Sequence, residues 1–347
     1  MKKLRALVVG LGRIGWDFHI PSIVNNKGFE LVAVVDPLKE RTDEAEQKFG
    51  CRPFLNLEEA LEKEKPDLTV IASPTKFHAE QTITAFRHGS DVFCDKPMAV
   101  FYQEAQDMAD AMKKYGRKFM MYQPRRISAD FMLLKQILAE DLIGPVFMIK
   151  RATSNYERRN DWQAFLKNGG GMLNNYGAHY VDQVLNIAGS KAVKMDCQLR
   201  VAASLGDAED VVKVIIETEN GILIDVDINQ AAAITLPEWY IFGKYGAMKW
   251  ENGAWRVRYY NPAELKDVKT QDGLAASSRA YGNGEAIPWK EKAVSTAETV
   301  PVDYYDKCYE YYALGDLPFV DVNESMEVMR VLKICREKAG IKLYPQE

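Results

Sequence analysis

The sequence predicts an α/β domain with a doubly wound parallel sheet, followed by an α+β domain built on an open, mainly antiparallel sheet. Over about the first 120 residues, short apolar runs alternate with helical patterns, and afterwards polar–apolar alternation takes over. The length of 347 residues also suits two domains, at roughly 150 residues each. We expect the domains to span residues 1–123 and 124–347.

Apolar runs in the first domain predict strands at residues 4–9, 31–35, 68–72, 91–94 and 119–122. They are rich in Val, Ile, Leu and Phe without polar alternation, which is typical of strands covered by helices on both faces. Between them, helices are expected at residues 43–49, 57–63, 79–88 and 102–115. Right-handed crossovers between such units produce a doubly wound sheet.

The second domain follows different rules. We expect helices at 129–140, 173–188 and 324–338, and strands at 146–153, 191–201, 211–218, 221–229, 239–242, 247–251 and 254–260. Asn-Gly pairs in two of the turns favour hairpins. Residues 262–301 show little periodicity and are expected to form a functional loop or an arm around a neighbouring subunit. Because an open sheet needs a cover, we expect a homodimer or homotetramer through that sheet.

Composition excludes several classes of protein. Forty-five Lys and Arg against forty-nine Asp and Glu give a net charge of −4, so a nucleic-acid partner is not expected. The apolar stretches are shorter than the ~18 residues of a membrane span, and the first is too short for a signal peptide. Five cysteines, widely spaced and without a CxxC pair, suit reduced thiols in the cytoplasm.

A glycine motif follows the first strand directly. It consists of Gly10, Gly12, Arg13, Ile14 and Gly15 in the pattern G-x-G-x-x-G. Gly10 permits a tight turn, Gly12 leaves room for a pyrophosphate, and Gly15 lets the next helix pack closely. The start of that helix then offers free N–H groups to the phosphates. The motif therefore predicts a dinucleotide site.

An acidic residue, Asp36, ends the second strand twenty-one residues after Gly15. A carboxylate there can accept both ribose hydroxyls and repels a 2′-phosphate, which favours NAD over NADP. Lys39 and Arg41 would weaken this preference, but we interpret them as a solvated first helical turn, so NADP remains possible. An S-adenosylmethionine site is the main alternative, since it uses a similar turn and acid.

Two later segments carry candidate catalytic residues. The strand at 91–94 ends in Asp95-Lys96-Pro97, which directs Lys96 into the crevice beyond the strand ends. In the helix expected at 173–188, Asn175, His179 and Asp182 are spaced to share one face.

These segments resemble the glucose–fructose oxidoreductase / inositol dehydrogenase (Gfo/Idh/MocA) family of NAD(P)-dependent oxidoreductases. The motifs are GLGRIG, the acid-Lys-Pro strand end, the turn Gly169-Gly170-Gly171 and the Gly177-Ala178-His179 helix with the following Asp182. Smaller echoes are Ser73-Pro74-Thr75 with His78, Tyr122-Gln123 with Arg125-Arg126, and Ile143-Gly144-Pro145. The resemblance covers residues 1 to about 190 by motif and the rest only as general architecture.

The resemblance implies an oxidoreductase that acts on a sugar, cyclitol or related polyol. It matches the family's lysine to Lys96 and its histidine to His179, and it implies cofactor contacts at Ser73, Pro74, Thr75, His78 and Pro97. The family's aspartate falls on Asn175, which is a departure. An amide can orient a neighbour but cannot stabilise an imidazolium as a carboxylate can, and Asp182 is a candidate substitute.

The chemistry needs these residue types. Oxidation of an alcohol removes a hydride and a proton, so we expect His179 to exchange the proton and Lys96 to hold and polarise the oxygen. Substrate contacts are expected from Tyr156, Trp162, Asn175 and Tyr176 beside them. His78 either lies beside the cofactor or caps a helix. No metal site is expected, because Asn175, His179 and Asp182 together offer one good ligand.

Two other functions remain open. Some relatives of the family oxidise a sugar transiently with bound NAD to cleave a glycosidic bond, so that no net NADH appears. The replacement at Asn175 also leaves room for a sensor that binds a dinucleotide without turnover.

Overall fold

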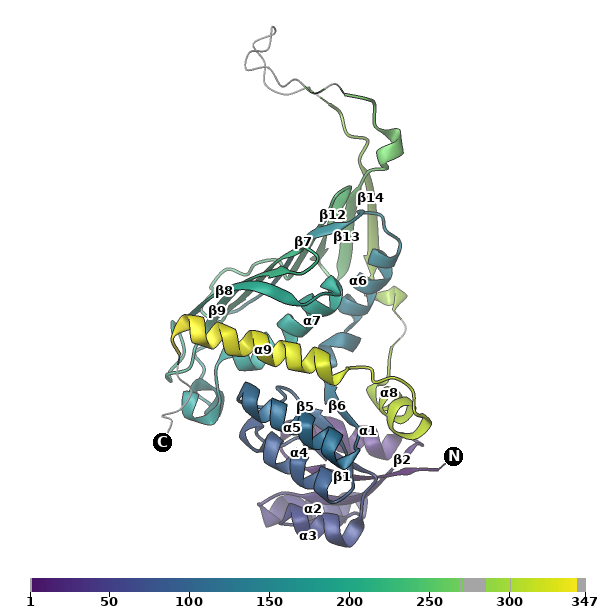
Figure 1. Cartoon of the computed structure of the whole chain (residues 1–347), viewed down its shortest axis with the longest axis vertical. Coiled ribbons are helices and arrows are strands. Elements are labelled where there is room, and N and C mark those ends of the chain that lie inside the picture. Colours follow the sequence, from purple (N-terminus) through teal and green to yellow (C-terminus); the bar gives the residue numbers. More distant parts are fainter. Residues whose placement is uncertain (1, 269, 271–284, 300, 342–347) are drawn as a thin grey trace.

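The fold combines two sheets, one above the other, with helices between and around them (Figure 1). The computed structural model describes residues 2–268, 270, 285–299 and 301–341. A six-stranded parallel sheet lies in the N-terminal part and an eight-stranded, mainly antiparallel sheet in the C-terminal part. The predicted fold class is confirmed.

The first sheet has the strand order β3-β2-β1-β4-β5-β6, with every neighbouring pair parallel. Its strands are β1 (Leu4–Val9), β2 (Phe29–Val35), β3 (Arg52–Phe54), β4 (Leu68–Ile71), β5 (Asp91–Asp95) and β6 (Phe119–Tyr122). β3 was not predicted, because three residues including a proline give no periodic signal. The strand order reverses between β1 and β4, which is where ligands bind in such sheets.

Helices cover both faces of this sheet. They are α1 (Ile20–Asn25), α2 (Lys39–Phe49), α3 (Leu57–Glu64), α4 (His78–Arg87) and α5 (Tyr102–Tyr115). Asn56 caps α3 by accepting the Glu59 N–H at 3.0 Å, as its position before the helix suggests. A π-helical turn, Gly15–His19, precedes α1. The helices bury strands that are apolar on both sides, as predicted.

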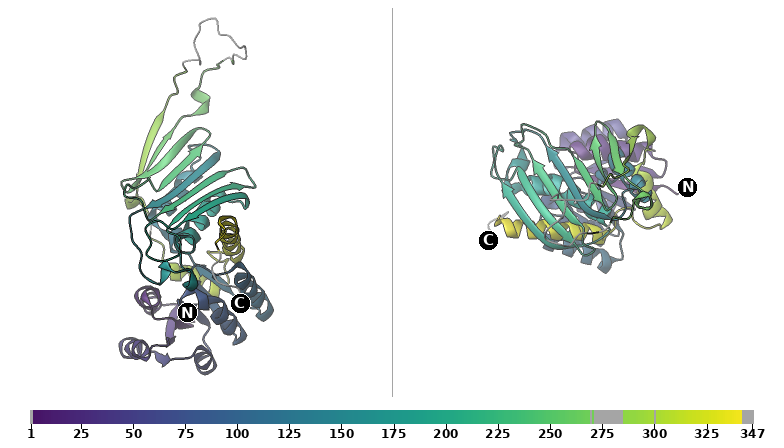
Figure 2. Two further views of the ribbon diagram at one scale, coloured as in Figure 1. Left: turned by 90° about the vertical axis from the view of Figure 1, so that its left-hand side faces the viewer. Right: turned by 90° about the horizontal axis from the view of Figure 1, so that it is seen from above.

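The second sheet has the order β14-β13-β12-β11-β7-β10-β9-β8. Its strands are β7 (Val146–Ser154), β8 (Ala192–Arg200), β9 (Val211–Thr218), β10 (Leu223–Asn229), β11 (Trp239–Gly243), β12 (Gly246–Glu251), β13 (Ala254–Tyr259) and β14 (Lys290–Ser295). Neighbours are antiparallel except β7 and β10. Seen from above, the strands form one face of the molecule (Figure 2).

Part of the loop predicted at residues 262–301 is instead ordered. β14 pairs with β13, and short 3₁₀ turns lie at Pro262–Glu264 and Thr296–Glu298. The strand escaped prediction because Val294 is its one buried side chain. Residues 269, 271–284 and 300 of the expected loop lie outside the described residues.

The remaining helices are α6 (Ala129–Ala139), α7 (Ala178–Ala188), α8 (Tyr304–Tyr309) and α9 (Val322–Ala339). α9 packs against β8 and α5 and so joins the two sheets (Figure 1). Asp321 and Glu324 form a capping box at its start. The helix thereby connects the predicted domains.

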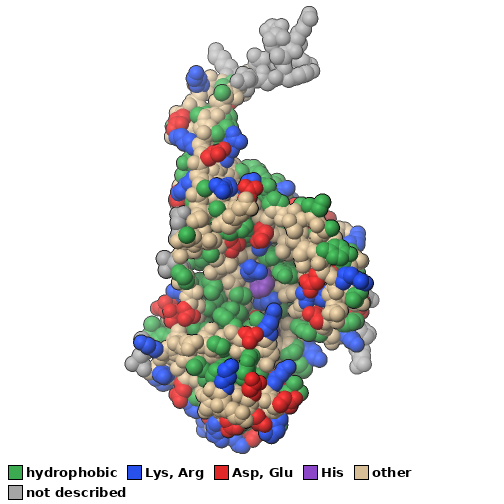
Figure 3. Space-filling view, turned by 180° about the vertical axis from the view of Figure 1, so that it is seen from behind, with side chains coloured by type: hydrophobic (Ala, Val, Ile, Leu, Met, Phe, Trp, Pro, Cys, Tyr) green, Lys and Arg blue, Asp and Glu red, His purple; other side chains and the backbone are tan. Residues whose placement is uncertain are grey.

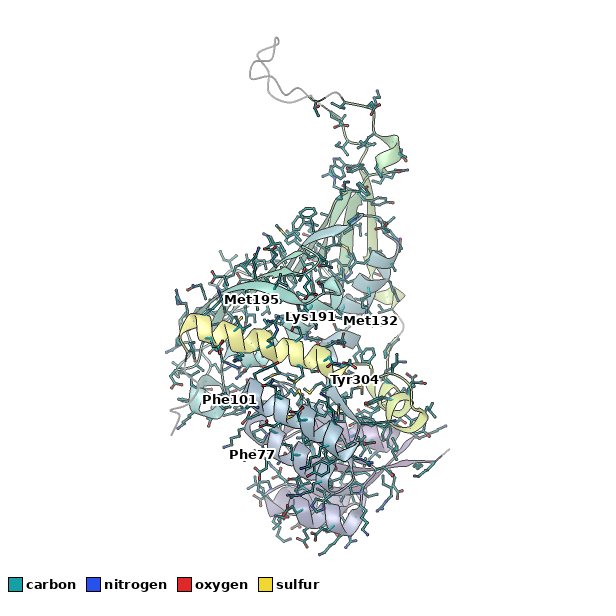
Figure 4. The ribbon with its side chains drawn as sticks, in the orientation of Figure 1. Phe77, Phe101, Met132, Lys191, Met195 and Tyr304 are labelled. Atoms are coloured by element: carbon teal, nitrogen blue, oxygen red, sulfur yellow. The ribbon has the colours of Figure 1, made fainter. Side chains whose placement is uncertain are left out.

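The chain returns to the first sheet through α8, which was not predicted. The hydroxyl of Tyr304 donates to the Met121 carbonyl at 2.8 Å, below α9 (Figure 4). The Tyr305 hydroxyl lies 2.8 Å from Nδ1 of His19. Residues assigned to the second predicted domain therefore complete the core of the first, while the division at residue 123 stays a prediction.

Two further features concern helix length and the cysteines. Within the described ranges, no helix is both long and apolar enough to cross a membrane. All five cysteines are buried and unbridged.

Candidate active site

A cleft of about 760 Å³ opens at the carboxyl ends of β1, β4 and β5, between the two sheets. Residues from the glycine turn, from Lys96 and from the start of α7 line the same cavity. In the space-filling view from behind, a histidine lies in a hollow beside lysine or arginine side chains (Figure 3). The position agrees with the ligand crevice expected for a doubly wound sheet.

The glycine turn has the geometry of a phosphate cradle. Gly10 has a φ of +91°, and a Cβ there would lie 2.6 Å from the Ser73 nitrogen. A Cβ on Gly15 would fall 1.9 Å from the Gly10 carbonyl oxygen, so the third glycine permits the helix to fold back on the turn. At Gly12 nothing lies within 4 Å of that position, which leaves open space facing the cleft. The residues present therefore fit a dinucleotide.

Asp36 supports this turn from the end of β2. Its Oδ2 accepts the Leu11 N–H at 2.8 Å and its Oδ1 accepts the Leu38 N–H at 3.0 Å. Nη1 of Arg41 lies 3.5 Å from Oδ2, and both side chains line the cleft. Arg41 is thus not merely part of a solvated helical turn, whereas Lys39 does pair with Asp43 at the surface.

Lys96 lies at the end of β5, as the Lys-Pro motif predicts. Its Nζ donates to Oδ1 of Asn175 at 2.9 Å and to the Asn175 carbonyl at 3.3 Å. Burial, aided by Arg125, Arg13 and Arg159, lowers the pKa of Lys96 to about 8, although the charge of Asp95 opposes that shift. The ammonium group therefore titrates close to neutral pH.

Asn175 belongs to a hydrogen-bonded chain across the cleft. Its Oδ1 accepts from Lys96, while its Nδ2 donates to Oε1 of Gln163 at 3.2 Å. Nη1 of Arg159 donates to the same Gln163 oxygen. Because a cation donates at each end, the amide oxygen of Asn175 must face the lysine and its NH₂ group must face Gln163.

The segment that carries Asn175 is not a regular α-helix. A π-helical turn, Leu173–Gly177, precedes α7 and replaces the α-helical start predicted at residue 173. Such turns are frequent at functional sites. Both Asn175 and His179 still face the cleft.

The expectation that Asp182 shares their face is wrong. Arg126 clamps the Asp182 carboxylate with two hydrogen bonds, of 2.6 and 2.8 Å, and also pairs with Glu324 at 2.9 Å. Both Arg126 and Asp182 are buried away from the cleft lining. Asp182 thus ties α7 to the start of α9 and does not replace the missing carboxylate.

His179 is set up to accept a proton. Its Nδ1 lies 3.2 Å from Oε1 of Gln123, whose own NH₂ group donates to the Ala178 carbonyl. Nδ1 therefore carries the hydrogen and Nε2 keeps its lone pair. Burial, then Lys96, Arg125 and Arg151, holds the pKa of His179 well below its usual value, so the ring is neutral.

The loop after β4 lines the other side of the cleft through Ser73, Pro74 and Thr75. His78 does not line it. The Nδ1 and Nε2 atoms of His78 lie 2.9 Å from the Pro97 and Ser73 carbonyls, respectively, and the side chain is buried. His78 thus connects the segments that follow β4 and β5, and its side chain does not cap α4; its expected place beside the cofactor stays a prediction.

The aromatic candidates separate into two groups. Trp162 and Tyr176 line the cleft. Tyr156 is 61% exposed and lies outside the cleft lining, where it forms an isolated bridge with Ala231. The structure thus brings two of the three aromatic candidates to the site.

The residues that hold the Gly169–Gly171 turn were not predicted. A Cβ on Gly171 would collide with the Glu209 carboxylate, whose Oε1 accepts the Leu173 N–H at 3.0 Å. Burial raises the pKa of Glu209 to about 7. Gln163 lies in the short 3₁₀ turn Trp162–Ala164 and Glu209 in an irregular segment, and neither gives a sequence signal. Gln123 belongs to the Tyr122-Gln123 motif, but its contact with His179 was not predicted.

Two family models match the chain. Residues 4–123 match the oxidoreductase family with an NAD-binding Rossmann fold, and residues 131–249 match the GFO/IDH/MocA C-terminal domain. The parallel six-stranded sheet and the mainly antiparallel eight-stranded sheet are the structures behind these two matches.

Relatives agree with the family models. The chain is 28% identical over 198 residues to a D-glucoside 3-dehydrogenase of Escherichia coli, a match that covers 55% of this chain and 56% of that protein. It is 25% identical over 233 residues to an inositol 2-dehydrogenase of Corynebacterium glutamicum, covering 66% and 67%. The match thus spans only about half the length of the glucoside dehydrogenase.

Structural similarity extends over the whole chain. The crystal structure of an NAD-binding protein from Listeria innocua superposes with a TM-score of 0.82 at 25% identity, covering 98% of this chain and 95% of that one. Its coverage includes the second sheet, where the sequence resemblance was only general. From its two domains and from these relatives, the chain belongs to the GFO/IDH/MocA family of oxidoreductases.

Proposed function

We propose that this protein transfers a hydride between NAD(H) and a secondary hydroxyl or carbonyl group of a sugar, cyclitol or related polyol. The observation that carries the proposal is that Lys96 and His179, from different parts of the chain, line the cleft that begins at the glycine turn. The relatives named as glucoside and inositol dehydrogenases support the substrate class.

The cofactor would lie along the first sheet. Its binding residues would be Gly10, Gly12, Arg13, Ile14, Asp36, Ser73, Pro74 and Thr75, all of which line the cleft. When bound, the nicotinamide cofactor accepts or supplies the hydride. The buried Asp36 carboxylate favours NAD, and the neighbouring Arg41 keeps NADP as the second candidate.

Two side chains would handle the hydroxyl group. Nε2 of His179 takes its proton as the C–H hydride leaves, and the ring returns that proton in the reverse direction. The Lys96 ammonium holds the same oxygen and stabilises the negative charge that develops on it. Asn175 positions Lys96 without neutralising it, because an amide accepts a hydrogen bond but carries no charge.

The assembly and setting are proposals too. We propose a homodimer or homotetramer that forms through the face of the second sheet that α7 and α9 leave uncovered (Figure 2). We also propose that the protein acts in the cytoplasm. Such an interface could bury the exposed aromatic ring of Phe147 and contact the ion pair between Lys213 and Asp225. Light scattering checks the assembly, and a monomer would contradict it.

A substrate panel tests the reaction. Neutral sugars, inositols and sugar acids are offered with NAD and with NADP, and the absorbance of the reduced cofactor is followed. Lys96→Met and His179→Ala should each lower kcat by roughly 10²- to 10⁴-fold while cofactor affinity stays near that of the wild type. Unchanged turnover in either variant would remove that residue from the mechanism.

The same panel separates the other functions. Release of free sugar from a glycoside without net reduced cofactor would indicate transient oxidation followed by bond cleavage. Tight cofactor binding without turnover of any compound would indicate a sensor, and the proposed dehydrogenase would then be wrong.

A further inference from the structure

The charges that line the cleft are unevenly paired. The cations are Arg13, Arg41, Lys96, Arg125 and Arg159, and the carboxylates are Asp36, Asp95, Glu157 and Asp161. On the cofactor side Arg41 pairs with Asp36 at 3.5 Å. On the opposite side Arg159 pairs with Asp161 at 2.9 Å and with Glu157 at 3.3 Å. Among the described residues, these pairings leave Lys96, Arg13 and Arg125 without a carboxylate ion pair, and Lys96 is instead hydrogen-bonded to Asn175.

Arg125 and Arg126 are neighbours in the chain with opposite surroundings. Both belong to the 3₁₀ turn Pro124–Ile127 that follows β6. Arg126 is buried against two carboxylates, Asp182 and Glu324. Arg125 faces the cleft, and no carboxylate pairs with its guanidinium within the described part of the chain.

The backbone of Arg125 is nevertheless fixed. Its carbonyl oxygen accepts from Nε2 of Gln183 at 3.1 Å and from the Ser128 hydroxyl at 2.8 Å. The cation is therefore held at the cleft by its main chain, while its planar N–H groups stay available. An arginine presented in this way matches a carboxylate or phosphate with two parallel hydrogen bonds.

The charges around His179 also favour an anionic ligand. The charged neighbours that shift its pKa are Lys96, Arg125 and Arg151, all cations, and each lowers it after burial. At position 175, next to the histidine, the side chain is an amide and adds no negative charge. Although Asp95 lies beside Lys96, the charges that act on His179 are thus all positive before a ligand enters.

We propose that the substrate is an anionic sugar, whose carboxylate or phosphate pairs with Arg125 while the hydroxyl to be oxidised lies at Lys96 and His179. The inference rests on the proposed hydride transfer and specifies its substrate class. Arg13, which also has no carboxylate ion pair among the described residues, belongs to the glycine turn and would face the pyrophosphate instead.

An anionic substrate would also lower the cost of protonating His179 during the reaction. In the reaction the C–H hydride passes to the oxidised cofactor, the O–H proton passes to Nε2 of His179, and a C=O bond forms. The resulting imidazolium would be costly beside three cations. A bound anion offsets part of that repulsion, so the substrate itself makes His179 a better base.

Matched sets of sugars test this inference. Glucose, glucuronate and glucose 6-phosphate, and the corresponding galactose compounds, are compared with wild type, R125Q and R125K. We expect kcat/KM for the preferred anionic form to exceed that of its neutral parent at least about 10-fold, and to fall as salt screens the pair. R125Q should lower kcat/KM for that anion roughly 10- to 100-fold, and R125K should restore part of the loss.

Arg158 supplies the matched control, since it is another exposed arginine nearby but does not line the cleft. R158Q should keep the wild-type ratio of anionic to neutral turnover. The uronate and phosphate arms identify which oxyanion binds.

The outcomes separate the two proposals. Neutral parents that react as well as their anions, or an R125Q enzyme with unchanged selectivity, would overturn the anionic substrate and leave hydride transfer intact. No reduced cofactor from any compound would count against the proposed function itself. Thermal unfolding shows whether R125Q folds, and if it does not, R125K carries the test.

Discussion

An aspartate at position 175 should move the alkaline limit of the reaction to higher pH. In the wild type, Nζ of Lys96 lies 2.9 Å from a neutral amide oxygen, and its pKa is lowered to about 8. If the ammonium form is the active one, kcat/KM should fall above about pH 8. Asn175→Asp would put a negative charge at the same hydrogen-bonding distance.

The size of the shift follows from that geometry. An opposite charge within ~4–6 Å raises the pKa of a lysine by about 1–3 units. The Lys96 pKa would therefore rise to roughly 9–11, and the ammonium form would persist to correspondingly higher pH. The new carboxylate would also face Oε1 of Gln163, 3.2 Å from the present Nδ2, without a donor. We expect the lost hydrogen bond to cost about 1 kcal/mol of stability.

The assay is the pH profile of kcat/KM for the best sugar of the panel, which reports the ionisations of the free enzyme and free substrate. Asn175→Ala is the matched control, because it removes the amide without adding a charge. Its alkaline limit should stay near the wild-type value, while Asn175→Asp shifts upward. Identical limits in the wild type and Asn175→Asp would refute the idea that Lys96 is the group that titrates.

Other predictions concern the turn, the cofactor and stability. Gly12→Ala should weaken NAD binding at least about 10-fold in a fluorescence titration. Its Tm should stay unchanged, because the added Cβ meets no protein atom. Gly15→Ala should instead lower Tm, because its Cβ would collide with the Gly10 carbonyl. Arg41→Ala should raise Kd for NADP more than Kd for NAD, and equal effects would contradict a role beside the ribose. Because burial raises the pKa of Glu209 from 4.5 to about 7, the folded state holds that proton more tightly. The free energy of unfolding should therefore fall by roughly 3 kcal/mol as pH rises from about 4.5 to about 7. Urea unfolding of Glu209→Gln should lack this slope.

Local patterns were enough to predict the first sheet except for β3, and its cofactor motifs as residues, but not the contribution of α8 to its core. The Gly10–Gly15 turn, Asp36 and Lys96 each follow a strand, and the carboxyl ends of parallel strands meet at one edge. The second sheet was predicted strand by strand, but its order was not, because β7 pairs with β10 and β11 across long stretches of sequence. β14 was missed because polar edge strands lack periodicity.

The candidate site was predictable as a set of residues but not as a network. The pattern identified Asn175 as a departure from the family and suggested Asp182 in its place by helical spacing. That suggestion failed because a π-helical turn and the buried Arg126 set the real partners, which spacing along one helix cannot reveal.

The hydrogen-bond partners of Asn175, which are distant in the sequence, explain why an amide fits at this position. Arg159 at one end and Lys96 at the other both donate, so two amides in series fit between them with every hydrogen bond correctly directed. A carboxylate at position 175 would neutralise the lysine but oppose the Gln163 oxygen. The amide thus preserves the positive charge at the reaction end of the cleft, and an anionic substrate is the ligand for which that charge would be an advantage.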